Sequence, residues 1–322
     1  MTASFLLATL LVLASTSAED ACPTIPELPT LACVATKQGW FYASSPQAAT
    51  QAADDGTEAI VAFRHYFGRE VPFGAVVLTD TFSKAGQDSF ITEKSLGYLR
   101  LWVPPESRAA MLEENIRRAM PNLPDDQVRS LALRASQSSG DVLRHEIGHS
   151  LYRAVFWPQY TPDDTRYATP APDWLDEASA ILLEPETMLA ERRTAFKNLL
   201  QEKLASIRPL SEFLAVSHPL ASQRAQLASQ GGSQTGAGIV MAVRSGDAAS
   251  DLATFYLQSL AIADFLIARS GKQDLLGDIS TALAGGTSFE SWLAKNGDKY
   301  HLGTDIAELD KQWMAWLDFH RR

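Results

Sequence analysis

The chain has 322 residues, of which 46% are hydrophobic and 20% are charged, and its formal net charge is −10 at pH 7. This length is enough for one or two hydrophobic cores. The acidic balance, without a cluster of Lys and Arg, argues against a nucleic-acid partner. It gives no attraction to anionic membranes either.

Residues 1–18 resemble a secretory signal. The apolar run Phe5–Ala14 is followed by small residues, with Thr16 and Ala18 at the positions that a signal peptidase reads. The segment is shorter than the roughly 20 apolar residues of a membrane-spanning helix. No Lys or Arg precedes the run, and Ala21 is an alternative cleavage point. We therefore expect an exported protein, periplasmic or secreted, with no stable membrane insertion.

The two cysteines of the chain, Cys22 and Cys33, follow this segment directly. In an oxidising compartment they could form a disulfide that closes a short, Pro-rich loop and pins the mature N-terminus. The alternative is a pair of free thiols in a cytosolic protein. We expect no metal-binding role for them, because neither has a histidine neighbour.

The segment after the cysteines predicts a helix followed by two strands. Ser45-Pro46 places a capping residue and a proline at a helix start, and Gly68 follows the end of the helix. A nearly continuous apolar run predicts a strand at Ala75–Thr79, and Gly97–Val103 predicts another, which two prolines stop. The sequence then predicts two more helices, at about 107–120 and after 124.

The next predicted helix carries the pentapeptide His145-Glu146-Ile147-Gly148-His149, an H-E-x-x-H pattern. Its apolar residues recur at a spacing of four, from Leu143 through the pentapeptide to Leu151. Ser139 or Asp141 offers an N-cap. The pentapeptide is therefore predicted to lie on a regular helix.

This placement gives the pentapeptide a metal-binding geometry. Residues at positions i and i+4 lie on one helical face, so His145 and His149 can bind the same metal ion. Glu146 then lies beside that ion, where its carboxylate can hold and deprotonate a bound water. The alternative is two ordinary histidines and a solvated carboxylate.

A third ligand is predicted on the following helix, in the segment Trp174–Ala180 with the sequence WLDEASA. A catalytic zinc site takes three protein ligands and leaves one position for water. Together with H-E-x-x-H, this segment resembles the W-L-x-E-G-x-A helix of the gluzincin metallopeptidases, the thermolysin and aminopeptidase type of zincin. Ala178 replaces the glycine, a change that a helix tolerates. By this resemblance Glu177 is the third Zn²⁺ ligand; the alternative is an exposed helix carboxylate.

Other H-E-x-x-H architectures fit less well. A metzincin needs a third histidine shortly after His149, and the chain has none there. A peptide deformylase needs a cysteine ligand, and both cysteines lie far upstream.

The resemblance implies a zincin-like α+β fold, with a small mixed sheet, zinc-site helices and a mostly helical C-terminal lobe. We expect a signal peptide at 1–18, an α/β lobe at 19–160 that ends in the H-E-x-x-H helix, and a helical lobe at 161–322 that carries Glu177. In this fold an edge strand binds extended peptide, and Gly97–Val103 is the candidate. A plain sheet strand is the alternative.

Gluzincins of the aminopeptidase type also use a tyrosine in the helical part to stabilise the oxyanion. Tyr256, in a helix predicted at Asp251–Arg269, matches that place; a tyrosine packed in the core is the alternative. His218 and His301 are weaker candidates for the same role. The aminopeptidase motif G-x-M-E-N is absent, since Met111–Asn115 lacks the glycine and lies in a predicted helix.

Three further segments complete the prediction. An irregular loop near the metal is expected at Trp157–Pro172, a mobile loop and candidate lid at Gln230–Ser250, and a final helix at about Asp305–Phe319. The resulting hypothesis is an exported zinc metallopeptidase that acts on a peptide or protein substrate. The alternatives are a catalytically silent zincin-like binding or assembly protein, and a processing protease with a single partner substrate. The sequence leaves the oligomeric state open.

Overall fold

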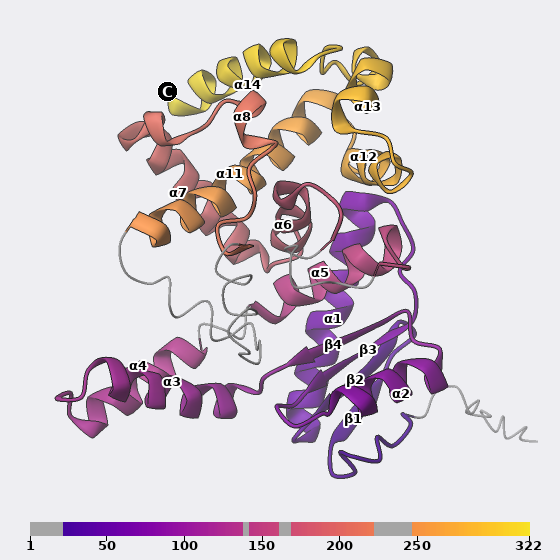
Figure 1. Cartoon of the computed structure of the whole chain (residues 1–322), viewed down its shortest axis with the longest axis vertical. Coiled ribbons are helices and arrows are strands. Elements are labelled where there is room, and N and C mark those ends of the chain that lie inside the picture. Colours follow the sequence, from indigo (N-terminus) through magenta and orange to yellow (C-terminus); the bar gives the residue numbers. More distant parts are fainter. Residues whose placement is uncertain (1–21, 138–141, 161–168, 222–246) are drawn as a thin grey trace, which may run out of the picture.

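The computed structural model describes residues 22–137, 142–160, 169–221 and 247–322. Within these residues the protein has an α+β architecture, with one four-stranded mixed sheet and 12 α-helices (Figure 1). The predicted signal at 1–18 and the predicted N-caps Ser139 and Asp141 lie outside the described residues.

The sheet consists of β1 (Ala32–Ala35), β2 (Gly39–Ala43), β3 (Gly74–Leu78) and β4 (Tyr98–Trp102), which lie side by side in that order. Strand β1 is antiparallel to β2, whereas β2, β3 and β4 are parallel to one another. The two predicted strands are confirmed as β3 and β4, and β4 is an outer strand of the sheet.

The helices α1 (Pro46–Phe67) and α2 (Lys84–Lys94) lie on opposite faces of the sheet (Figure 1). Alternate residues of a strand point to opposite faces, so Phe41 and Val76 pack in one core cluster with Phe63 of α1. Their neighbours Tyr42, Ala75 and Val77 form a second cluster with Phe90 of α2. The predicted start and end of α1 are confirmed, with Ser45 as N-cap and Gly68 in the left-handed conformation.

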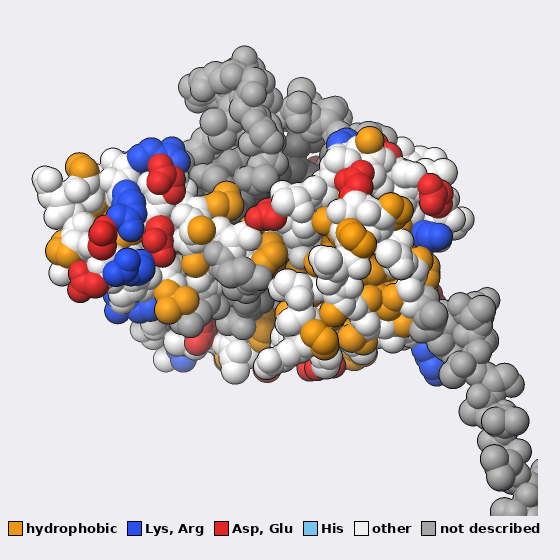
Figure 2. All heavy atoms as spheres, turned by 90° about the horizontal axis from the view of Figure 1, so that it is seen from below, with side chains coloured by type: hydrophobic (Ala, Val, Ile, Leu, Met, Phe, Trp, Pro, Cys, Tyr) orange, Lys and Arg blue, Asp and Glu red, His pale blue; other side chains and the backbone are white. Residues whose placement is uncertain are grey.

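A helical hairpin connects β4 to the H-E-x-x-H helix. It consists of α3 (Pro105–Ala119) and α4 (Asp125–Gln137), which confirm the two predicted helices. The hairpin projects sideways from the rest of the protein (Figure 1). Basic and acidic side chains alternate on it in the view from below (Figure 2).

The rest of the described chain is helical. Its elements are α5 (Val142–Phe156), α6 (Asp173–Ile181), α7 (Glu186–Glu202), η2 (Leu204–Ser206), α8 (Leu210–Phe213), α11 (Asp247–Ser270), α12 (Leu275–Ala284), α13 (Phe289–Asn296), η3 (Asp298–Tyr300) and α14 (Ile306–Arg321). One cluster of buried apolar residues runs through these helices and includes α1.

Helix α11 corrects one prediction. It begins at Asp247, so the last residues of the loop predicted at Gln230–Ser250 are helical, and residues 230–246 lie outside the described residues. Among the described residues, the stretch Asp251–Ser270 of α11 is long and apolar enough to cross a membrane, but half of it is buried inside the protein. A core helix has the same composition.

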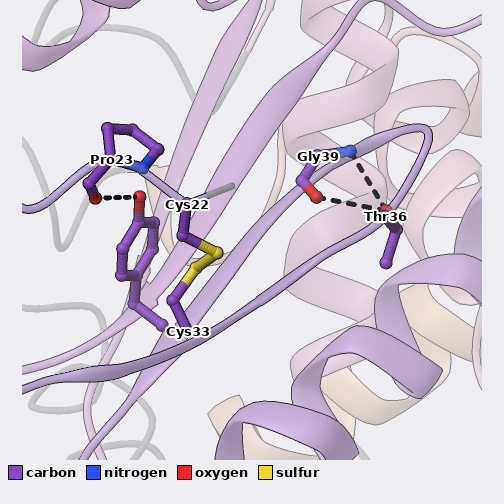
Figure 3. Close-up of a disulfide and its surroundings, with 6 residues drawn as sticks. Cys22, Pro23, Cys33, Thr36 and Gly39 are labelled. Atoms are coloured by element: carbon purple, nitrogen blue, oxygen red, sulfur yellow. Dashed lines mark hydrogen bonds between the residues drawn. A yellow bond between two sulfur atoms is a disulfide. The ribbon is translucent and has the colours of Figure 1, made fainter. Parts of the chain in front are cut away.

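The pairing of Cys22 with Cys33 is confirmed (Figure 3). The disulfide ties the first described residue to β1, and the Tyr42 hydroxyl donates to the Pro23 carbonyl at 2.7 Å beside it. At the other end of β1, Thr36 and Gly39 close the turn into β2 through hydrogen bonds of 3.1 Å (Figure 3). The N-terminal segment is thus fixed to the sheet.

Candidate metal centre

Helix α5 buries the apolar face that its sequence predicts, with Leu143, Ile147 and Leu151 all in the core. Gly148, inside the H-E-x-x-H pentapeptide, faces α6. A Cβ atom at this position would lie 2.7 Å from the Cα of Ala180, closer than such atoms approach in proteins. The glycine therefore allows the backbones of α5 and α6 to come together.

This close approach assembles the three predicted ligands. His145, His149 and Glu177 each offer one ligand atom, and these atoms lie within 4.8 Å of one another. Nε2 of His145 is 3.3 Å from Oε1 of Glu177, and Nε2 of His149 is 3.8 Å from Oε2. Two ligands of a tetrahedral zinc, each at about 2.0–2.1 Å, are about 3.3 Å apart. The closest pair has this spacing, and the three donor atoms lie near enough to one another to bind one metal ion.

Both imidazoles are oriented by carboxylates that sequence reasoning did not assign. Nδ1 of His145 is 2.8 Å from Oε1 of Glu184, and Nδ1 of His149 is 2.7 Å from Oδ1 of Asp176. A carboxylate accepts hydrogen bonds, so in each neutral imidazole Nδ1 carries the proton and Nε2 is left with a lone pair for a metal ion. Metal-binding histidines show this arrangement. The sequence holds one signal for Asp176, because this residue occupies the variable position x of the W-L-x-E segment, directly before Glu177.

The two orienting carboxylates are themselves held in place. Arg192 of α7 donates to both oxygens of Glu184, from Nε at 2.5 Å and from Nη2 at 2.7 Å. The Thr169 hydroxyl donates to the second oxygen of Asp176. Paired guanidinium–carboxylate hydrogen bonds fix direction as well as distance. The imidazoles are therefore positioned before any metal binds.

The buried carboxylate of Glu177 favours a cation in the cluster. Glu177 is fully buried, and burial alone raises the pKa of its carboxyl. The imidazoles of His145, His149 and His218 outweigh burial and hold that pKa below its usual range. Burial lowers the pKa of His145, but Glu177 and Glu184 raise it to about 9. A buried carboxylate that must be balanced by a proton or a metal ion suits a metal site.

Tyr256 and His218 lie beside the cluster. The ring of Tyr256 is 6.2 Å from that of His145 and 5.6 Å from that of His218, centre to centre. Nε2 of His218 is 3.6 Å from Oε2 of Glu177, and its Nδ1 accepts a hydrogen bond from the Leu220 N–H at 3.1 Å. A neutral His218 therefore carries its proton on Nε2, toward Glu177. His301 is exposed next to η3 and is not part of this cluster.

Glu146 is more exposed than the three predicted ligands. Its side chain is 25% exposed, and it forms an ion pair with Arg100 of β4. The side chain of Glu177 is 0% exposed and that of His145 is 7% exposed. The predicted base thus lies at the solvent side of the cluster.

Comparisons with protein-family models, with curated proteins and with solved structures give no match to this chain. The resemblance to gluzincins therefore depends on the two motifs of the sequence.

Proposed function

We propose that the protein is an exported zinc-dependent peptidase of the gluzincin type. The observation that carries this proposal is the set His145, His149 and Glu177, of which His145 and Glu177 are buried and in which a carboxylate orients each imidazole. This set supplies the two nitrogen ligands and one oxygen ligand of a catalytic zinc site and leaves the fourth position for water. The disulfide supports an oxidising compartment such as the periplasm or the cell exterior.

In the proposed reaction the three ligands hold Zn²⁺, which when bound lowers the pKa of a coordinated water to about 7 and polarises the substrate carbonyl. Glu146 takes the proton of the attacking water and later gives it to the leaving amine. Asp176 and Glu184 keep the imidazoles directed at the ion. Each of these residues comes from α5, from α6 or from the turn that follows α6.

Two side chains are candidates for stabilising negative charge on the carbonyl oxygen. The Tyr256 ring lies near His145, so its hydroxyl is a donor that could reach the reacting group. His218 presents Nε2–H to the same region, but that nitrogen faces the ligand Glu177. We assign the oxyanion role to Tyr256 and the support of Glu177 to His218.

The test is cleavage of a diverse peptide mixture by the zinc-loaded protein, read by mass spectrometry. Glu146→Gln should keep the zinc and lose the cuts, because only the proton acceptor is removed. His149→Ala should lose both zinc and cuts. Cuts that persist in purified Glu146→Gln would rule out this mechanism.

A processing protease with one partner substrate, or a silent binding protein, is the second candidate. The ion pair between Arg100 and Glu146 favours it, because that pair engages the base when no substrate is present. Bound zinc without any cut in the peptide mixture would support this candidate.

A further inference from the structure

Arg100 and Glu146 form the accessible side of the cluster. Their side chains are 24% and 25% exposed, whereas those of His149 and Glu177 are 11% and 0% exposed. A substrate that approaches the buried ligands therefore meets the Arg100–Glu146 ion pair first. Oε2 of Glu146 accepts a hydrogen bond from Arg100, so the guanidinium competes with a water molecule for this carboxylate.

Arg100 also lies where an extended peptide would bind. It is the central residue of β4, and β4 forms the outer edge of the sheet in the described part of the chain. Arg100 is paired in register with Val76, whose side chain is on the sheet face covered by α1 and α5. A peptide added along β4 would therefore pass directly beside the guanidinium.

The guanidinium is held near the ring of Trp102, two residues along the same strand. Its Cζ is 5.7 Å from the centre of that ring, and the Cζ of Arg108 is 4.3 Å from the same ring. Two guanidinium groups are thus gathered around one indole at the end of β4.

We propose that Arg100 recognises a carboxylate of the substrate, which replaces Glu146 as the ion-pair partner of Arg100. This inference rests on the proposed peptidase function and names its substrate class, a peptide with a carboxylate next to the cleaved bond. The planar fork of a guanidinium matches a carboxylate. Exchange of one carboxylate for another keeps Arg100 paired while it releases Glu146 to act on water. The carboxylate is either the C-terminus of the peptide or an Asp or Glu side chain.

The first test measures binding to the zinc-loaded Glu146→Gln variant, in which no carboxylate of the protein competes at this position. The probes are two matched pairs of fluorescent peptides. The members of the first pair differ only in having a free or an amidated C-terminus, and those of the second differ only in having an internal Glu or Gln. We expect the charged member of one pair to bind about tenfold more tightly. The pair that shows the preference identifies the source of the carboxylate.

The matched variant is Glu146→Gln combined with Arg100→Gln, which should remove the preference. Arg118→Gln, an equal change of charge at a side chain that is 71% exposed on α3, should keep it. Equal binding of charged and neutral peptides, or a preference that survives Arg100→Gln, would overturn the inference.

The second test compares cleavage of the same pairs by the wild type and by Arg100→Gln. We expect Arg100→Gln to lower kcat/KM for the charged peptide and not for the neutral one, mainly by raising KM. An equal loss of kcat for both peptides would show that Arg100 only positions Glu146, and would overturn recognition. Equal cleavage of the charged and the neutral peptide by the wild type would also overturn recognition, but it would not contradict the peptidase function. No cleavage with zinc bound contradicts a peptidase of general specificity, and the binding test then decides the role of Arg100.

Discussion

Nδ1 of His145 donates a hydrogen bond to Oε1 of Glu184 at 2.8 Å, and Arg192 binds both oxygens of the same carboxylate. This chain of contacts connects α5, the turn after α6, and α7. It fixes the ring of one proposed zinc ligand through a residue that belongs to neither motif.

Glu184→Gln should therefore weaken zinc binding by about 10- to 100-fold, because an amide orients the imidazole less strongly than a carboxylate. Competition with a chromogenic chelator measures the affinity. Glu186→Gln is the control, since that side chain is 78% exposed and pairs with Arg193. Equal zinc affinity in Glu184→Gln and the wild type would contradict the role given to Glu184.

Gly148→Ala should destabilise the protein by about 1–3 kcal/mol, because the new methyl group meets the backbone of Ala180 and must push α6 away. Zinc affinity should fall together with stability, since Glu177 is carried by α6. Urea unfolding and chelator competition measure the two effects. An unchanged unfolding midpoint would show that α5 and α6 do not need this close contact.

The stability of the metal-free protein should fall as the pH rises from 6.5 to about 9. The pKa of His145 is raised in the folded state, so its protonated form stabilises the fold fully below 6.5 and no longer does so above about 9. Over the same range zinc affinity should rise about tenfold per pH unit, because the metal replaces the proton on His145. Thermal unfolding with and without chelator, across pH, measures both trends. A zinc affinity independent of pH would contradict this exchange.

Loss of the disulfide should cost stability but leave the metal centre intact. The bond closes a loop with a sequence separation of 11, for which loop entropy gives about 3 kcal/mol. The Cys22→Ser and Cys33→Ser double variant should unfold at lower urea concentration and bind zinc as the wild type does. A matching loss of zinc affinity would show that the N-terminal segment shapes the site.

Tyr256→Phe should lower kcat by about a hundredfold with little effect on zinc affinity, because it removes a donor to the developing oxyanion and no ligand. The measurement is kcat and KM on a substrate found in the peptide mixture. Unchanged kcat would return the oxyanion role to His218 and leave Tyr256 as a packing residue.

The sequence by itself predicted the local features of this protein. The caps of α1, the apolar face of α5 and the spacing of His145 and His149 depend on residues close together in the chain, and the structure has them as expected. Strands β1 and β2 escaped prediction, although β2 is as long as the predicted strands β3 and β4. Helix α2 escaped it because Phe90 is its single buried residue.

Tertiary structure alone decided which side chains surround the proposed ligands. Glu184 and Arg192 reach His145 from beyond α6, Arg100 reaches Glu146 from β4, and His218 reaches Glu177 from the chain after α8. These contacts join segments that are distant in sequence, and no periodicity or spacing encodes them. They exist because the buried apolar faces of α5, α6 and the sheet pack in one arrangement, which then places each charged group next to another.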